Sequence, residues 1–473
     1  MKKTSKNEIG PEPPSTDART PAPRTRSAAE LLAAGKGLRG KVLRQAQGVW
    51  KRPADRADPL AILRASDASR LAHLLPIRYG RMLQTPFTFY RGAAAVMAAD
   101  LAKTPATGIR VQACGDCHLL NFGGFATPER NILFDINDFD ETLPAPWEWD
   151  VKRLVASFVL AAGSNGLPDS DGRDAAVTCA QSYREHMREY SEMSPLEVWY
   201  ASIDSEDMLG LAPNARGKAS LRQRIAKATK QSGSEVDYPQ LAGMVGGRIR
   251  IQDNPPLIFH PEEAEAKDFQ TLLEENHALY RESLADDRRI LLDRYRVVDG
   301  AMKVVGIGSV GTRCAIILMM SVSNEPLFLQ WKEANNSVLE PYAGKSAYSH
   351  HGQRVVMGQR LMQPATDTFL GWLTGRKGHH GYVRQLRDAK IKPLVETFDA
   401  EILSQYAKAC GWALARAHAK AGDALTISGY LGTKDPFDEA MGDFALAYAD
   451  QTERDHAALK AAVRAGKVEV HIE

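Results

Sequence analysis

The sequence predicts an α+β fold of two lobes with extra helices. The chain has 473 residues, which is more than one hydrophobic core usually fills. Segments with the alternation of strands gather in two separate stretches, and segments with helical periodicity surround both of them. The hydrophobic fraction of 44% and the charged fraction of 25% are ordinary for a soluble globular protein.

The first half of the chain reads as a tail followed by a largely helical region. Residues 1–27 are rich in Pro, Thr, Lys and Arg, so we expect a disordered tail there. Residues 28–247 begin and end with helical patterns, and between them the strand-like segments NFGGFA and NILFDIND flank turn residues, which predicts a hairpin. The stretch LLPIRYGRMLQTPFTFYRG interrupts the first helices, and its Arg91 is predicted in a buried strand, as is Arg384 further on.

The second half opens with a polar, Pro-bearing segment over residues 248–290, which we expect to be a linker. Residues 291–395 then contain five strand-like segments, MKVVGIG, TRCAIILMMSV, PLFLQWKEA, DTFLGWL and GYVRQLRD, with a helical segment among them. Residues 396–473 close the chain with helices. This division predicts that the strands of residues 291–395 form one lobe.

Charge, apolar runs and cysteines exclude several classes of partner. The net charge of +2 marks neither nucleic acid nor a membrane as a partner, and the longest apolar run, 314–322, is too short to cross a bilayer. Five cysteines are an odd number without a disulfide pattern, and Cys114 and Cys117 have no second pair at zinc-ribbon distance. We therefore expect a cytoplasmic protein, and no signal for an oligomeric state is present.

The first chemical motif is GDCHLLN, residues 115–121, at the end of a predicted strand. Phosphoryl transfer needs a carboxylate that orients or deprotonates the attacking hydroxyl, and oxygen ligands that hold Mg²⁺. Asp116 fits the first task, whereas Asn121 and Asp138 fit the second. Asp135 is the alternative to Asp138 if the register differs. An acidic turn next to an Asn also occurs as a solvated loop with side-chain caps.

The second motif is the glycine-rich segment GIGSVG, which contributes Gly306, Gly308, Ser309 and Gly311. A dinucleotide-binding unit would need a helix after the last glycine, but the β-like run TRCAIILMMSV follows instead. That pattern favours a hairpin whose glycine turn folds over ATP phosphates, with Lys332 on a later strand as the phosphate-contacting ammonium. The structural alternative is a glycine hairpin followed by a solvated strand lysine. Taken together with the first motif, the glycine segment and Lys332 favour the functional interpretation over the structural one.

The residues of these motifs resemble a known pattern. GDCHLLN, ILFDINDFDET and WEWDVKRLVASF resemble the aminoglycoside phosphotransferase and protein-kinase-like superfamily. The whole chain resembles an uncharacterised bacterial family, domain of unknown function number 2252. The resemblance implies that Asp116 is the catalytic Asp, that Asn121 and Asp138 are metal ligands, and that Asp150 braces the catalytic loop. Asp140 stands where protein kinases have Gly.

The order of the motifs is reversed relative to ordinary kinases, because the glycine segment and Lys332 follow the catalytic motif. The resemblance therefore implies a circularly permuted two-lobed fold. Its catalytic and metal-binding part lies in residues 28–247, its nucleotide-binding lobe in residues 291–395, and its completing helices in residues 396–473. A circular permutation changes the order of the segments along the chain but keeps the packing contacts between them. It predicts that the segment from Tyr406 to Ala419 packs beside the strand that ends at Gly115.

These observations predict a Mg-ATP-dependent phosphotransferase that acts on a hydroxyl of a small molecule or protein, with ATP and Mg²⁺ as cofactors. The first alternative is a nucleotide-binding pseudokinase scaffold. It arises because Met357 stands where a helical acid is expected to pair Lys332, with Glu333 and Glu340 as other candidates. The second is a transferase that moves AMP, if ATP lies reversed in the cleft.

Overall fold

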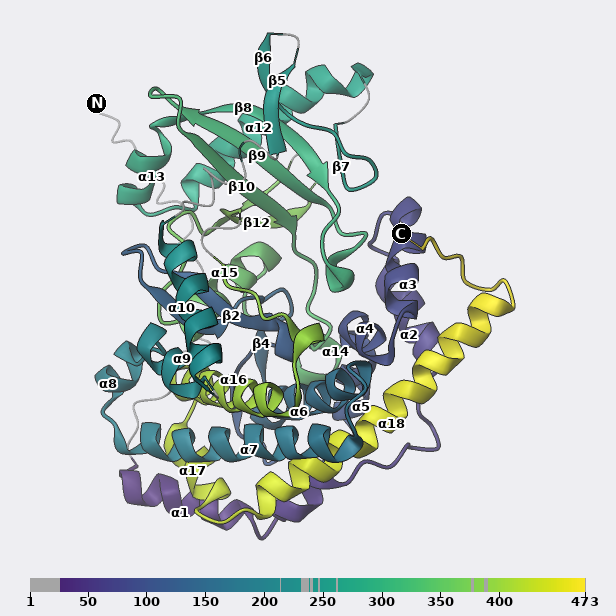
Figure 1. Ribbon diagram of the computed structural model, residues 1–473, viewed down its shortest axis with the longest axis vertical. Coiled ribbons are helices and arrows are strands. Elements are labelled where there is room, and N and C mark those ends of the chain that lie inside the picture. Colours follow the sequence, from purple (N-terminus) through teal and green to yellow (C-terminus); the bar gives the residue numbers. More distant parts are fainter. Residues whose placement is uncertain are drawn as a thin grey trace, which may run out of the picture.

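The computed structural model has a mixed α+β fold, which confirms the predicted fold class at that level. Figure 1 shows a sheet in one part of the molecule and long helices in the other. The structure describes residues 26–212, 214–230, 238, 241–245, 247–260, 263–375, 378–386 and 390–472. The tail predicted over residues 1–27 lies almost entirely outside the described residues.

The main sheet has six antiparallel strands in the order β11-β12-β10-β9-β8-β7. Its strands are β7 (Ile258–Phe259), β8 (Tyr295–Lys303), β9 (Cys314–Ser321), β10 (Pro326–Glu333), β11 (Gly371–Thr374) and β12 (His380–Gln385). In β9, Leu318 belongs to one core cluster and Met319 to another, so both faces of the strand are covered. Double coverage explains the continuous apolar run that the sequence shows there.

Helices accompany this sheet on the segments that connect its strands. They are α12 (Glu263–Glu282), α13 (Asp286–Leu292), α14 (Glu340–Ala343) and α15 (His351–Met362). The helix α15 contacts β11 and β12, and α12 contacts β8 and β11. Residues 248–290, predicted as a linker, contain β6 (Arg248–Ile251), β7 and α12, and β7 is the edge strand of the sheet.

Long helices build the other part of the molecule and its largest core. They are α6 (Trp147–Ser164), α7 (Asp169–Glu192), α16 (Ala400–Ala421) and α18 (Pro436–Arg464), and the short helix α17 (Ala424–Leu431) lies between the last two in the chain. Trp147 stacks on Tyr183 with ring centroids 5.7 Å apart, which joins α6 to α7. The shorter helices are α1 (Ala28–Leu38), α2 (Pro59–Asp67), α3 (Leu75–Leu83), α4 (Pro86–Gly92), α5 (Ala94–Leu101), α8 (Pro195–Tyr200), α9 (Ser205–Leu211) and α10 (Ala215–Lys230). No described helix is both long enough and apolar enough to span a bilayer.

Three two-stranded sheets complete the fold. They are β1 (Arg110–Ala113) with β4 (Leu143–Pro146), β2 (Phe122–Ala126) with β3 (Ile132–Ile136), and β5 (Ala242–Val245) with β6 (Arg248–Ile251). The pairing of β2 with β3 confirms the predicted hairpin. Its turn includes Arg130 in the left-handed region, with φ of 69°.

The predicted strand at Arg91 is wrong, because this stretch folds as the helices α3 and α4. Pro86 occupies the first turn of α4, where a missing N–H costs no hydrogen bond. The Thr85 side chain accepts a hydrogen bond from the Thr88 backbone N–H at 3.1 Å and caps the helix start. Prolines that suggested an interruption therefore begin a helix. The prediction for Arg384 is confirmed, since it lies in β12.

The helix α16 packs beside β1 and the GDCHLLN segment, as the sequence predicts. The Tyr406 hydroxyl donates to the carbonyl oxygens of Leu119 at 2.9 Å and Phe122 at 3.0 Å. The His418 ring lies 3.3 Å from the Asp150 carboxylate. Two segments that are nearly three hundred residues apart therefore share one core.

Candidate functional site

A buried lysine meets two carboxylates at the centre of the site. Lys332 lies on β10, and its ammonium is 2.6 Å from Asp140 Oδ2 and 3.8 Å from Asp138 Oδ1. The Tyr382 hydroxyl, on the neighbouring strand β12, donates to Asp140 Oδ1 at 2.6 Å. Asp138 and Asp140 follow the end of β3. The two motifs predicted from sequence thus meet, although 192 residues separate Lys332 from Asp140.

The two carboxylates have opposite electrostatic environments. Burial raises the pKa of Asp140, but the Lys332 charge and the hydrogen bonds from Lys332 and Tyr382 together outweigh burial, and the pKa falls to about 2. For Asp138, burial and the nearby Asp140 charge raise the pKa. Burial lowers the pKa of Lys332, but Asp138 and Asp140 reverse that effect and raise it. The lysine therefore stays charged. Of the two carboxylates, Asp138 is the one whose burial is less fully offset by nearby positive charge.

The glycine segment connects β8 to β9 and lies against these acids. It contains a single 3₁₀ turn over Ile307–Ser309. The Ser309 hydroxyl donates to Asp140 Oδ2 at 3.4 Å. A Cβ atom at Gly308 would lie 3.9 Å from Asp116 Oδ2 and 3.5 Å from the Arg91 carbonyl oxygen. This connection therefore covers the acid cluster at close range.

The predicted catalytic acid is held by an arginine that the sequence did not identify. Arg153, on α6, donates from Nε at 2.7 Å and from Nη2 at 2.5 Å to the same Asp116 oxygen, Oδ1. Asp116 is 21% exposed at its side chain, and its other oxygen, Oδ2, lies 3.9 Å from His118 Nε2. The Asn121 amide nitrogen donates to the Asp116 carbonyl oxygen at 2.6 Å. Asn121 Oδ1 is thereby directed away from this backbone contact.

A second carboxylate holds the backbone of the same loop. Asp150 accepts hydrogen bonds from the backbone N–H groups of Cys114 at 2.6 Å and Gly115 at 3.0 Å. Gly115 has φ of +86°, a conformation that favours glycine. The His418 ring links Asp150 to the Tyr183 hydroxyl, which lies 2.9 Å from His418 Nδ1. The backbone of the loop that carries Asp116 is therefore held in place by Asp150 and the His418 ring behind it.

Asp135, the alternative to Asp138, serves a different contact. Its carboxylate is fully buried and lies 2.6 Å from Arg416 Nη2 on α16. Burial raises the pKa of Asp135 to about 6, despite this partner. Asp138, by contrast, lines a cavity. The structure therefore places Asp138 and not Asp135 beside Lys332.

The helix α15 supplies no acid to Lys332. Met357 lies on this helix. Glu333 instead contacts Arg313 at 3.0 Å, and Glu340 accepts from Asn336 at 2.9 Å. The helix supplies Arg354, which donates to the Asp140 carbonyl oxygen at 2.8 Å. Asp140 is the partner of the lysine, and the two-residue spacing of the acids in FDINDFD was the available signal.

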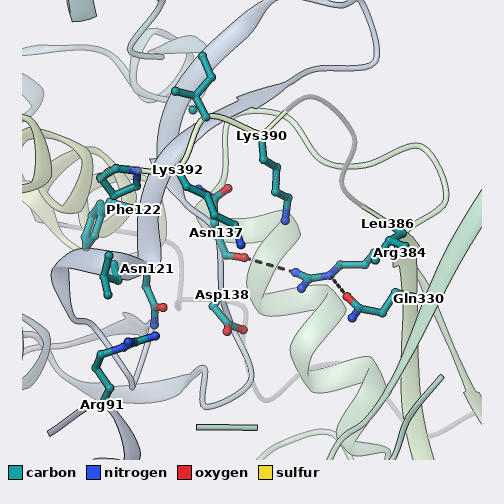
Figure 2. Close-up of a pocket in the computed structure, with 14 residues that line it drawn as sticks. Arg91, Asn121, Phe122, Asn137, Asp138, Gln330, Arg384, Leu386, Lys390 and Lys392 are labelled. Carbon is teal, nitrogen blue, oxygen red and sulfur yellow. Dashed lines mark hydrogen bonds between the residues drawn. The ribbon is translucent and has the colours of Figure 1, made fainter. Parts of the chain in front are cut away.

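A cavity of about 290 Å³ opens next to Asp138. Figure 2 shows its wall, to which β10, β12, the GDCHLLN segment and residues 390–393 contribute. Asn121 and Asp138 are the predicted site residues that line it. The sequence did not identify four further polar lining residues, Asn137, Gln330, Lys390 and Lys392. Arg91 and Arg384, which the sequence analysis predicted in buried strands, line it as well.

The donor set bears on metal binding. No cluster of three or more His, Cys, Asp or Glu side chains with metal-site geometry occurs in the described part of the chain. Mg²⁺ usually takes one or two protein carboxylates and completes its shell with water and phosphate oxygens. Asp138 Oδ1 is buried and has no hydrogen-bond partner among the described residues. Because it accepts no hydrogen bond from these residues, this oxygen fits a cation. The five cysteines are all free and buried.

The fold and the site define a mixed α+β protein in which a glycine segment, a buried lysine and an acidic loop converge. The chain belongs to the family described as uncharacterized protein conserved in bacteria (DUF2252), which matches residues 70–462. Neither the curated proteins nor the solved structures include a match to the chain.

Proposed function

We propose that the protein is a Mg-ATP-dependent phosphotransferase that acts on a hydroxyl group. The observation that carries this proposal is the contact between Lys332 and the acids Asp138 and Asp140 beneath the glycine segment. Phosphoryl transfer depends mainly on positioning and charge neutralisation, and these are the groups that such a site needs. The arrangement of Lys332 on the strand that follows the glycine hairpin supports the resemblance to kinases.

Each group has a task that follows from its surroundings. Lys332 would contact phosphate oxygens as a charge held in place by burial. The backbone of Gly306–Gly311 would cover the same phosphates. Asp116 would orient the acceptor hydroxyl through Oδ2, because Arg153 already occupies Oδ1. Arg153 is thus a positioning residue, since it holds the carboxylate in one orientation.

Asn121 and Asp138 are the residues that would hold Mg²⁺. Asn121 uses its amide nitrogen on the Asp116 backbone, which leaves its amide oxygen as the ligand atom. Asp138 contributes its buried Oδ1, which accepts no hydrogen bond from the described residues and lies 3.8 Å from the Lys332 ammonium. The bound metal would supply positive charge that neutralises the phosphates.

The test is the substitution Asp116→Asn. Loss of a general base costs about 10²- to 10⁴-fold in turnover, so ATP consumption should fall by that factor, while Mg-ATP binding measured by calorimetry should stay within about twofold. Asp286→Asn is the matched control, because its side chain is 94% exposed. Unchanged ATP turnover in Asp116→Asn would refute the assigned role.

A nucleotide-binding pseudokinase is the second candidate, and one observation favours it. Arg153 donates two hydrogen bonds to Asp116 Oδ1, so one oxygen of the proposed base is occupied before any acceptor binds. This candidate predicts that Mg-ATP raises the melting temperature while no group is transferred with any divalent metal. Release of ADP would support phosphate transfer, whereas release of pyrophosphate and an AMP adduct in mass spectra would support the AMP transferase.

A further inference from the structure

The cavity beside Asp138 carries more positive than negative charge. Among the described residues that line it, four are cationic, namely Arg91, Arg384, Lys390 and Lys392, whereas one, Asp138, is acidic. In the view of Figure 2, Asp138 lies between Arg91 and Arg384, and the Lys390 side chain extends into the same space. A concave, partly buried wall of one charge sign concentrates ligands of the opposite sign.

Three of these cations lack a carboxylate partner. Arg384 donates from Nε to the Gln330 side chain at 3.2 Å and from Nη1 to the Asn137 carbonyl oxygen at 3.4 Å, and both partners are neutral. The Arg91 Nε atom is buried and has no hydrogen-bond partner. Within the described ranges, no carboxylate lies at ion-pair distance from Arg91, Arg384 or Lys390. Buried charges without a partner are costly, so such a group indicates a missing anion.

The environment of Lys390 agrees with this interpretation. The Arg384 charge and burial lower the pKa of Lys390 to about 7. Asp138 and Asp367 act in the opposite direction, and Lys392 adds to the lowering. A cation that is weakened mainly by a neighbouring cation regains its charge when an anion binds between them.

The placement of these cations departs from what a purine base needs. Gln330 and Lys332 lie on one face of β10, since alternate residues of a strand share a face, and Gln330 pairs with Arg384 across the sheet. Arg384 therefore lies one strand repeat from the lysine proposed to contact phosphate. Small-molecule pockets that hold flat apolar groups are lined mainly by apolar side chains. Here charged and amide groups occupy that wall.

We propose that this cavity binds a phosphate group, recognised by Arg384 and Lys390 with Arg91 at its rim. The proposal rests on the proposed function, because it names the ligand chemistry of the same site. The phosphate can belong to the polyphosphate of the nucleotide or to a phosphorylated acceptor. In either case two guanidinium groups and an ammonium group supply charge-assisted hydrogen bonds to its oxygens.

Calorimetry with the full chain tests this proposal, with pyrophosphate and uncharged adenosine as probes and no metal added. Wild type should bind pyrophosphate, and Arg384→Gln and Lys390→Gln should each weaken binding about 10-fold or more, as expected for a charge-assisted hydrogen bond. Lys345→Gln is the control, because Lys345 is exposed and outside the cavity wall. Circular dichroism verifies that each variant is folded.

Competition separates the two sources of the phosphate. If ATP displaces pyrophosphate and both variants weaken ATP binding, the group belongs to the nucleotide. If ATP and pyrophosphate bind together, it belongs to the acceptor. Absence of pyrophosphate binding to wild type, or binding that neither variant changes, overturns the proposal. ATP turnover that depends on Asp116 would then leave the proposed function intact. If wild type binds pyrophosphate but does not turn over ATP, the phosphate site is supported and the proposed function fails.

Discussion

Removal of the Lys332 charge is the perturbation that bears most directly on the site. Lys332→Met keeps a long unbranched side chain on β10 but leaves Asp140 without its 2.6 Å partner. The lysine is 3% exposed, so water cannot replace it. We expect a less stable protein that no longer binds Mg-ATP, because the same ammonium stabilises the acids and is proposed to contact the phosphates.

The pKa of Asp140 gives the size of the expected loss in unfolding free energy. It is lowered from 3.8 to about 2, which corresponds to about 2.5 kcal/mol at about 1.36 kcal/mol per pKa unit. Because the folded pKa is the lower one, this stability is fully present above about pH 4 and is lost as the pH falls through about 2. At pH 7 the unfolding free energy of Lys332→Met should therefore fall by about 2–3 kcal/mol. The difference from wild type should shrink below pH 4.

The assay is urea unfolding followed by tryptophan fluorescence at several pH values, together with calorimetric titration of Mg-ATP. Lys345→Met serves as the control, since Lys345 is exposed. A double-mutant cycle with Asp140→Asn should give a coupling energy of about 1–3 kcal/mol, as contacting residues do. Additive effects of the two substitutions, or unchanged Mg-ATP binding in Lys332→Met, would refute the reasoning.

Three further outcomes follow from the same contacts. Asp150→Ala leaves the buried N–H groups of Cys114 and Gly115 without an acceptor, so urea unfolding should show a loss of about 2–5 kcal/mol; a loss below 1 kcal/mol contradicts the bracing role. Gly311→Ala should cost about 1–2 kcal/mol, because Gly311 has φ of +90°, whereas Gly306→Ala, with open space around it, should be near neutral. Chelation of divalent cations should abolish ATP turnover but leave the melting temperature unchanged; a large shift would indicate a structural metal.

Much of the local structure could be predicted because it depends on neighbouring residues. Turn residues between two strand-like segments predicted the hairpin of β2 and β3. The starts of helices were harder to predict, because a proline can either end a helix or occupy its first turn. Pro86 occupies the first turn of α4 and is capped by Thr85, so the stretch around Arg91 is a helix although its composition suggested an interruption.

The candidate site was predictable in part for the same reason. The residue types and spacing of GDCHLLN and GIGSVG pointed to Asp116, Asn121 and Lys332. The partner of Lys332 was not predictable, because Asp140 approaches it across a turn that follows β3. Arg153 clamps Asp116 from a helix 37 residues later, and no local pattern links the two. Such contacts depend on packing between elements.

The sequence by itself determined the mixed α+β class, the strand-like character of residues 291–395 and the two motifs that contain acids, amide and glycines. Those properties arise from periodicity and side-chain chemistry along the chain. Only the tertiary structure decided that Asp138 rather than Asp135 lies beside Lys332, and that cations gather in the adjacent cavity. The physical reason is that burial and charge pairing depend on segments far apart in sequence, whose meeting is set by the packing of the whole core.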